Sequence, residues 1–126
     1  MHRSRLFGML VDTPASSAPA AADFWAAALG GSAHQSVDEP EYTRITGTVD
    51  GFAMVVQSVD DQARIHLDIE TDDVQAESER LLALGATLVT DNGGHKILRA
   101  PGGHLLCVVP VQSPADIFTT TAQSWP

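Results

Sequence analysis

The sequence contains little cysteine and little positive charge. Its 126 residues include one cysteine, Cys107, and seven lysines and arginines against 16 aspartates and glutamates, for a formal net charge of −9. A single cysteine excludes an internal disulfide framework and is typical of a reducing cytoplasm, which is the location we expect. The acidic balance argues against nucleic acid and anionic membranes as partners, because both attract basic surfaces.

Long apolar runs are also absent. The segment MHRSRLFGMLVDTP begins with basic residues, but its apolar run is short and ends at Asp12, so it makes a poor signal peptide. No stretch approaches the length of a membrane-spanning helix. With 44% hydrophobic and 18% charged residues, the chain instead has the composition of an ordinary folded domain. Its length suits one core, or two small modules that share one.

Residues 64–86, RIHLDIETDDVQAESERLLALGA, predict a strand, a turn and a helix. The first part alternates apolar and polar side chains, as a half-buried strand does. Asp73 is a good helix N-cap, and Gly85 is a good stop signal because glycine adopts the left-handed conformation at little cost. Three apolar residues are expected to share one face of this helix: Val74, Leu81 and Leu84.

A fainter copy of this segment lies near the start of the chain. Residues 5–11 are apolar and predict a strand that Asp12 closes, and an alanine-rich helix follows over 20–29. Both helices end in a Leu-Gly pair. We expect Phe24 and Trp25 to anchor the first helix to the core. The two copies indicate an internal duplication.

Short strands follow each helix, and the predicted order is strand-helix-strand-strand-strand, twice. The fold class is therefore α+β, and the hollow that two such sheets leave is where a ligand would bind. We expect one domain over 1–126, with a module over 1–61, a module over 62–111 and a tail over 112–126. The tail carries Phe118 and Trp125, which are expected to dock on the body or on a neighbouring subunit. The remaining strands are expected over 32–37, 42–48, 52–59, 86–90, 95–99 and 104–109.

Three motifs in this order resemble the vicinal oxygen chelate superfamily, which includes glyoxalase I, extradiol dioxygenases and bleomycin-resistance proteins. They are HLDIETDD (66–73), LLALGA (81–86) and APGGHLLCVVP (100–110). The resemblance extends to about residue 111 and is greatest to glyoxalase-like, bleomycin-resistance-type proteins. It implies the glyoxalase/bleomycin-resistance/dioxygenase fold, in which two βαβββ modules form a curved mixed sheet around a cleft. It also implies a homodimer.

The resemblance further implies four metal-ligand positions, which here are Arg5, Gln57, His66 and Cys107. The superfamily's usual histidines and carboxylates are thus replaced at three of the four positions. Arginine is always charged and has no lone pair to donate to a metal. We therefore expect a metal-independent protein without a cofactor.

Strand alternation predicts that several polar side chains face the cleft. Arg5 is expected to pair with Asp68, either as a structural ion pair or as an anion-binding arginine that Asp68 orients. Tyr42 is a candidate stacking surface, and Cys107, among leucines and valines, is expected to be a small, inert core residue. The full set of candidate ligand-binding residues is Arg5, Tyr42, Gln57, His66, Asp68 and Cys107.

Three functions are consistent with these residues. The first is a metal-independent protein that binds a small organic ligand, for example to sequester a natural product, and the acidic charge would suit a cationic one. The second is a lyase or isomerase in which His66 is the acid or base and Arg5 stabilises an enolate-like oxygen. The third is an assembly domain whose cleft is filled by its own side chains.

Overall fold

The computed structural model describes all 126 residues and confirms the α+β class. The order strand, helix and three strands occurs twice, as predicted, and a short helix and a strand follow. The first strand is longer than expected, and a 3-10 turn links it to the first helix. The elements are β1 (His2–Pro14), η1 (Ala15–Ser17), α1 (Ala18–Leu29), β2 (Ser32–Gln35), β3 (Tyr42–Thr46), β4 (Ala53–Val59), β5 (Arg64–Thr71), α2 (Val74–Ala83), β6 (Thr87–Asp91), β7 (Lys96–Arg99), β8 (Leu105–Pro110), α3 (Ala115–Thr121) and β9 (Gln123–Trp125).

The chain forms two compact units. One is Gly8–His66, and the other combines Met1–Phe7 with Leu67–Pro126. Strands β1 and β5 each run from one unit into the other, so these two strands contribute residues to both. No helix is long and apolar enough to cross a membrane.

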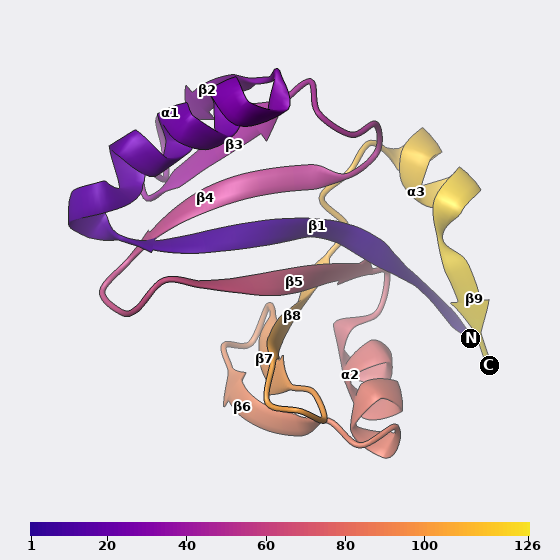
Figure 1. The fold of residues 1–126 in the computed structure, drawn as a ribbon. Helices are drawn as coiled ribbons and strands as arrows, with labels where there is room; N and C mark the ends of the chain where they lie inside the picture. The colour runs from indigo at the N-terminus through magenta and orange to yellow at the C-terminus, as the bar shows by residue number, and fades with distance from the viewer. The chain divides into compact units, whose positions relative to one another are not determined.

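In the Gly8–His66 unit the strand order is β2-β3-β4-β1. Strand β1 runs parallel to β4, whereas β3 is antiparallel to both β2 and β4. Helix α1 lies on one face of these strands (Figure 1). Its small alanines come close to the sheet and bury an apolar layer. The buried members of this layer are Ala22, Ala26, Ile45, Met54 and Val56.

Helix α1 does not use both of its aromatic residues in the core. Trp25 packs against the apolar layer, but Phe24 is 61% exposed and meets Trp25 edge-on with 5.1 Å between ring centroids. The prediction that Phe24 is a core residue is therefore wrong. The physical reason is that Ala22 and Ala26, four residues apart, form the stripe that faces the sheet, and Phe24 lies off that stripe.

Close contact between β1 and β4 fixes their register. A Cβ atom on Gly8 would lie 2.3 Å from the carbonyl oxygen of Ala53, so only glycine fits at this position. Gly8 is paired with Ala53, and the same register places Asp12 opposite Gln57.

In the other unit, β5, β8, β7 and β6 are consecutive neighbours, with β5 parallel to β8. Asp73 caps helix α2 as predicted, because its side chain accepts a hydrogen bond from the Ala76 amide. Strand β9 pairs with the beginning of β1, so the two chain ends lie side by side (Figure 1). Phe118 is buried, which confirms that the tail docks on the body of its own chain.

The buried face of α2 is polar. The side chains that this helix buries completely are Glu77 and Ser78, whereas Leu84 is 67% exposed. Val74 and Leu81 are half-buried, but Leu84 lies beyond the last residue of α2 and is exposed, so the predicted apolar face holds only in part. Burial here follows the hydrogen-bonding partners of Glu77 rather than the positions of the leucines.

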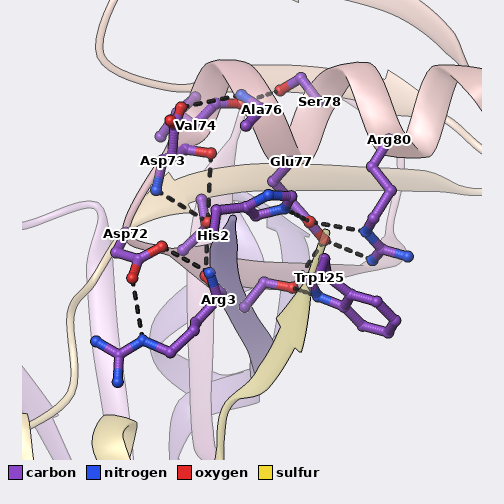
Figure 2. A network of polar contacts seen from close by, with 12 residues as sticks. His2, Arg3, Asp72, Asp73, Val74, Ala76, Glu77, Ser78, Arg80 and Trp125 are labelled. Atoms are coloured by element: carbon purple, nitrogen blue, oxygen red, sulfur yellow. Dashed lines mark hydrogen bonds and ion pairs between the residues drawn. The ribbon is translucent and has the colours of Figure 1, made fainter.

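Glu77 is the centre of a hydrogen-bonded network (Figure 2). Its carboxylate accepts hydrogen bonds from Arg80 Nε at 2.9 Å and Nη2 at 2.7 Å, and from Ser4 Oγ at 2.9 Å. His2 Nε2 lies 2.6 Å from the same carboxylate. Trp125 joins the network, because its indole nitrogen donates to Ser4 Oγ at 2.8 Å and the Arg80 guanidinium lies 3.7 Å from its ring centroid. The network ties both chain ends to α2.

Strand β5 also buries its polar face. Ile65 and Leu67 are 54% and 43% exposed, whereas His66 and Glu70 are buried. The alternation of the strand is as predicted, but the apolar side is the one left uncovered within the chain.

The ionisation of Glu77 contributes to stability. Burial opposes its charge, but the hydrogen bonds from Arg80, His2 and Ser4, together with the charge of Arg80, outweigh burial and lower its pKa below the ordinary value of 4.5. A carboxyl with a lowered folded-state pKa stabilises the fold above its unfolded pKa. This contribution is lost as the pH falls below about 4.5 and through the folded-state value.

We predict that Glu77→Gln lowers the free energy of unfolding at pH 7 by about 3 kcal/mol, because it removes one partner of a buried ion pair. Urea denaturation between pH 3 and pH 7 measures this, and the deficit relative to wild type should shrink towards pH 3. Glu79→Gln, the same change at an exposed position of α2, should cost less than about 0.5 kcal/mol. Equal losses in the two variants, or a deficit independent of pH, would contradict this role.

Candidate functional site

A row of polar side chains crosses the Gly8–His66 unit on the face away from α1. Strand register pairs Tyr42 with Gln57 and Gln57 with Asp12. Val11 and Val56, their neighbours along β1 and β4, pack with the layer under α1. Because successive side chains alternate between faces and paired residues share a face, Tyr42, Gln57 and Asp12 point away from the helix.

His66 lies next to Asp12 and extends this row. Its Nδ1 lies 2.8 Å from Asp12 Oδ2, and the two residues are only 8% and 2% exposed. Arg64 Nε donates to the same oxygen at 3.3 Å, and Arg64 Nη1 donates to Asp61 at 3.2 Å. The other oxygen, Asp12 Oδ1, is buried and has no hydrogen-bond partner in the structure.

The Asp12 contact determines what His66 can do chemically. A carboxylate only accepts hydrogen bonds, so it selects the tautomer in which Nδ1 carries the proton and donates it. Nε2 is then the basic nitrogen of the ring. Asp12 also fixes the orientation of the ring and stabilises the imidazolium that forms when Nε2 takes up a proton, as carboxylates do for general-base histidines.

Tyr42 and Gln57 form the other end of the row. Both are half-buried, and Gln57 Nε2 donates to the Tyr42 hydroxyl at 3.4 Å. An aromatic ring and a primary amide are groups that hold an organic ligand by packing and hydrogen bonding. The structure thus brings three of the predicted ligand-binding residues, Tyr42, Gln57 and His66, into one row.

The other predicted residues lie in the second unit. The Arg5 side chain is buried there, with Nη1 3.7 Å from Glu70 Oε1. Glu70 also accepts hydrogen bonds from the main-chain nitrogens of Gln112 at 2.8 Å and Ser113 at 3.0 Å, and from the Ser113 hydroxyl. Glu70 is thus a carboxylate that holds the start of the tail and also lies beside Arg5, a role that the sequence did not suggest.

Asp68 and Cys107 are direct partners in the parallel pair of β5 and β8. Both are half-buried. Cys107 is therefore not the fully buried core residue that its apolar neighbours predicted.

The ligand set of the superfamily's metal enzymes does not fit the four equivalent positions here. Arg5 is a cation beside a carboxylate, and the Gln57 amide nitrogen donates to Tyr42. His66, Asp68 and Cys107 do carry donor atoms of types that Zn²⁺ uses, so metal content is a necessary control in any assay. None of the chemistry that follows depends on an ion.

Asp12 is the residue of this site that the sequence did not single out. The sequence predicts it only as the residue that closes the first strand. Its signal in the sequence is that it falls on the same strand face as apolar residues such as Leu10. An acidic side chain on such a face is expected to be buried and to need a partner.

A family model described as "Glyoxalase-like domain" matches residues 8–109. No curated protein matches the chain. Among solved structures, a hypothetical protein from Bacillus halodurans aligns with a TM-score of 0.63 and 10% identity, covering 89% of this chain and 97% of that one.

Two further structures are similar in fold. A protein described as NAD-dependent benzaldehyde dehydrogenase from Legionella pneumophila aligns with a TM-score of 0.58 and 9% identity, covering 82% of this chain and 99% of that one. A variant of methylmalonyl-CoA epimerase from Streptomyces coelicolor, in complex with 2-nitronate-propionyl-CoA, aligns with a TM-score of 0.56 and 17% identity, covering 86% and 98%. At these identities the likeness shows the fold alone.

We predict that Asp12→Asn changes the tautomer of His66. In wild type the proton should reside on Nδ1, whereas an asparagine amide can donate to Nδ1 and move the proton to Nε2. Side-chain ¹⁵N NMR of the imidazole distinguishes the two forms. Asp61→Asn, which alters the other acid beside Arg64, is the control and should keep the wild-type tautomer. The same tautomer in all three proteins would exclude Asp12 as the residue that sets it.

Proposed function

Because the chain belongs to the glyoxalase-like domain family, we propose that it binds a small organic molecule and that His66 transfers a proton of this ligand. The reaction class is that of a lyase or isomerase. The observation that supports it is the buried hydrogen bond between His66 Nδ1 and Asp12, at 2.8 Å. A histidine oriented in this way is a general base at Nε2.

The chemistry needs only side chains of the row. Nε2 takes a proton from a carbon next to a carbonyl group, and the electron pair of that C–H bond moves onto the carbonyl oxygen as an enolate. The Asp12 carboxylate stabilises the imidazolium that results. The imidazolium then returns its proton: delivery to the neighbouring carbon of an enediolate gives the isomer, and delivery to the original carbon regenerates the substrate, which is seen as exchange in D₂O. Both routes regenerate neutral His66.

Tyr42 and Gln57 have binding roles in this proposal. The Tyr42 ring packs on an apolar part of the ligand, and its hydroxyl and the Gln57 amide are donors for the enolate oxygen. Metal independence is part of the proposal, because Arg5 cannot ligate an ion and Gln57 offers only a neutral amide oxygen in place of a histidine or carboxylate.

The second candidate function is binding without turnover, as in sequestration of a natural product in the cytoplasm. Tyr42 and Gln57 support it, because a half-buried ring and an amide recognise a ligand without taking part in chemistry. The net charge of −9 suits a cationic ligand. The two candidates share the row and differ in whether His66 moves a proton.

The test is deuterium exchange at carbon next to a carbonyl group, followed by ¹H NMR in D₂O with a panel of 2-oxo acids, hydroxyketones and acyl thioesters. Wild type should exchange at least one of them, and His66→Gln should lower the rate by about 10²-fold or more while binding changes only a few fold. His34→Gln, at an exposed histidine of β2, should keep the wild-type rate.

Each outcome separates the candidates. Exchange that persists in His66→Gln would exclude His66 as the base, and binding of a panel member without exchange would favour sequestration. Exchange that is lost on treatment with EDTA, and restored by Zn²⁺, would overturn metal independence.

We also propose that the protein is a homodimer. Ile65 and Leu67 leave an apolar face of β5 uncovered, and a second copy is an occupant that would remove it from water.

Sedimentation velocity should therefore show a dimer for wild type at about 50 μM. Ile65→Lys should shift the protein to a monomer, because it would bury an unpaired charge at the interface. Val37→Lys, at an exposed loop position, should remain dimeric. A monomeric wild type, or a dimeric Ile65→Lys variant, would argue against this interface.

A further inference from the structure

A groove of about 580 Å³ lies within the Gly8–His66 unit, on the side of the sheet that carries α1. It is on the opposite face from the row that contains His66, and it is not used by the proposed function. One wall comes from η1 and the first half of α1. The other comes from β2, β3 and β4 and from the turn before β3.

Small side chains leave this groove open. The residues that η1 and α1 contribute include Ala15, Ala18, Pro19 and Ala22, so the part of the helix that lines the groove has no long apolar side chain to fill it. Ala33 is opposite them on β2. These walls are therefore formed by short apolar side chains, which leave room for the compact body of a small organic molecule.

Charge of one sign lines the groove. Its ionisable side chains are Asp23, from α1, and Glu41, from the turn before β3. No lysine, arginine or histidine lines it. Neither carboxylate is in an ion pair or side-chain hydrogen bond within the chain, in contrast to the buried Asp12 and Glu77. Two carboxylates on opposite walls of a concave surface concentrate negative potential between them.

Neutral polar groups complete the lining. Gln35 pairs with Thr43 in register, and Ser58 donates its main-chain N–H to the Glu41 carbonyl at 2.7 Å. Thr43 and Ser58 are half-buried, and their hydroxyls make no hydrogen bond within the chain. They are therefore able to accept hydrogen bonds from a ligand.

We propose that this groove binds a small organic ammonium ion, with the apolar body against the alanines and the ammonium group between Asp23 and Glu41. An ammonium ion is the occupant because it supplies the missing counter-charge and up to three hydrogen-bond donors, whereas an anion would be repelled by both walls. Asp23 and Glu41 are exposed, so the bound cation would be only partly removed from water.

The test uses benzylamine, which is protonated at pH 7, and its neutral analogue benzyl alcohol. Titrations followed by ¹H–¹⁵N NMR should show benzylamine shifting the resonances of the groove, with weak but saturable binding in the millimolar range. Benzyl alcohol should bind at least about fivefold more weakly, because it has the same apolar body without the charge.

The double variant Asp23→Asn with Glu41→Gln should weaken benzylamine binding about tenfold, the effect of two partly solvated ion pairs. The control is Asp38→Asn with Glu39→Gln, which removes the same charge from the neighbouring turn outside the groove and should change affinity less than about twofold. Ala33→Leu, which fills the groove without changing charge, should also weaken binding.

Equal weakening in the two double variants would show a general charge effect and overturn the site. Equal binding of amine and alcohol, or no saturable shift at the groove, would overturn it as well. Proton exchange by His66 is measured separately, on the other face of the sheet, so failure of one proposal leaves the other standing.

Discussion

The hydrogen bond between Asp12 and His66 closes the Gly8–His66 unit. Asp12 lies near the end of its first strand and His66 is its last residue, so this one contact ties together residues 54 positions apart in the sequence. Burying a carboxylate this deeply is costly unless a partner is supplied, and His66 and Arg64 supply it. The same contact orients the imidazole, so the interaction that stabilises the unit also prepares its candidate base.

Three buried carboxylates organise the chain, and each is satisfied differently. Glu77 is surrounded by side-chain donors from β1 and α2, and Glu70 is held largely by the main chain and hydroxyl of residues 112–113. Both oxygens of these two residues are engaged, as expected for structural carboxylates. Asp12 alone keeps an oxygen without a partner. Incomplete satisfaction of a buried group is characteristic of functional sites, which agrees with the place of Asp12 beside His66.

The order of the elements could be predicted from the sequence, because it depends on local signals such as strand alternation, the Asp73 cap and the glycines after each helix. The choice of buried face could not. It depends on partners distant in the sequence, such as His2 for Glu77, and these override the apolar stripe that includes Leu84. For the candidate site, strand alternation singled out Gln57 and His66, and the structure places both in the polar row; their part in binding or catalysis stays a prediction. Asp12 was missed because its importance comes from its contact with His66, 54 positions away, and an acidic side chain at the end of an apolar strand does not identify that partner.

The tight approach of β1 to β4 at Gly8 fixes the register of β1, and with it the position of Asp12. Inserting or deleting a single residue between them would turn Asp12 to the side of α1, and Val11 or Thr13, respectively, would take its place beside His66. Divergence within this segment is therefore restricted to substitutions. Changes of length are confined to places such as the turn between β2 and β3, where the strand pairing places no such restriction.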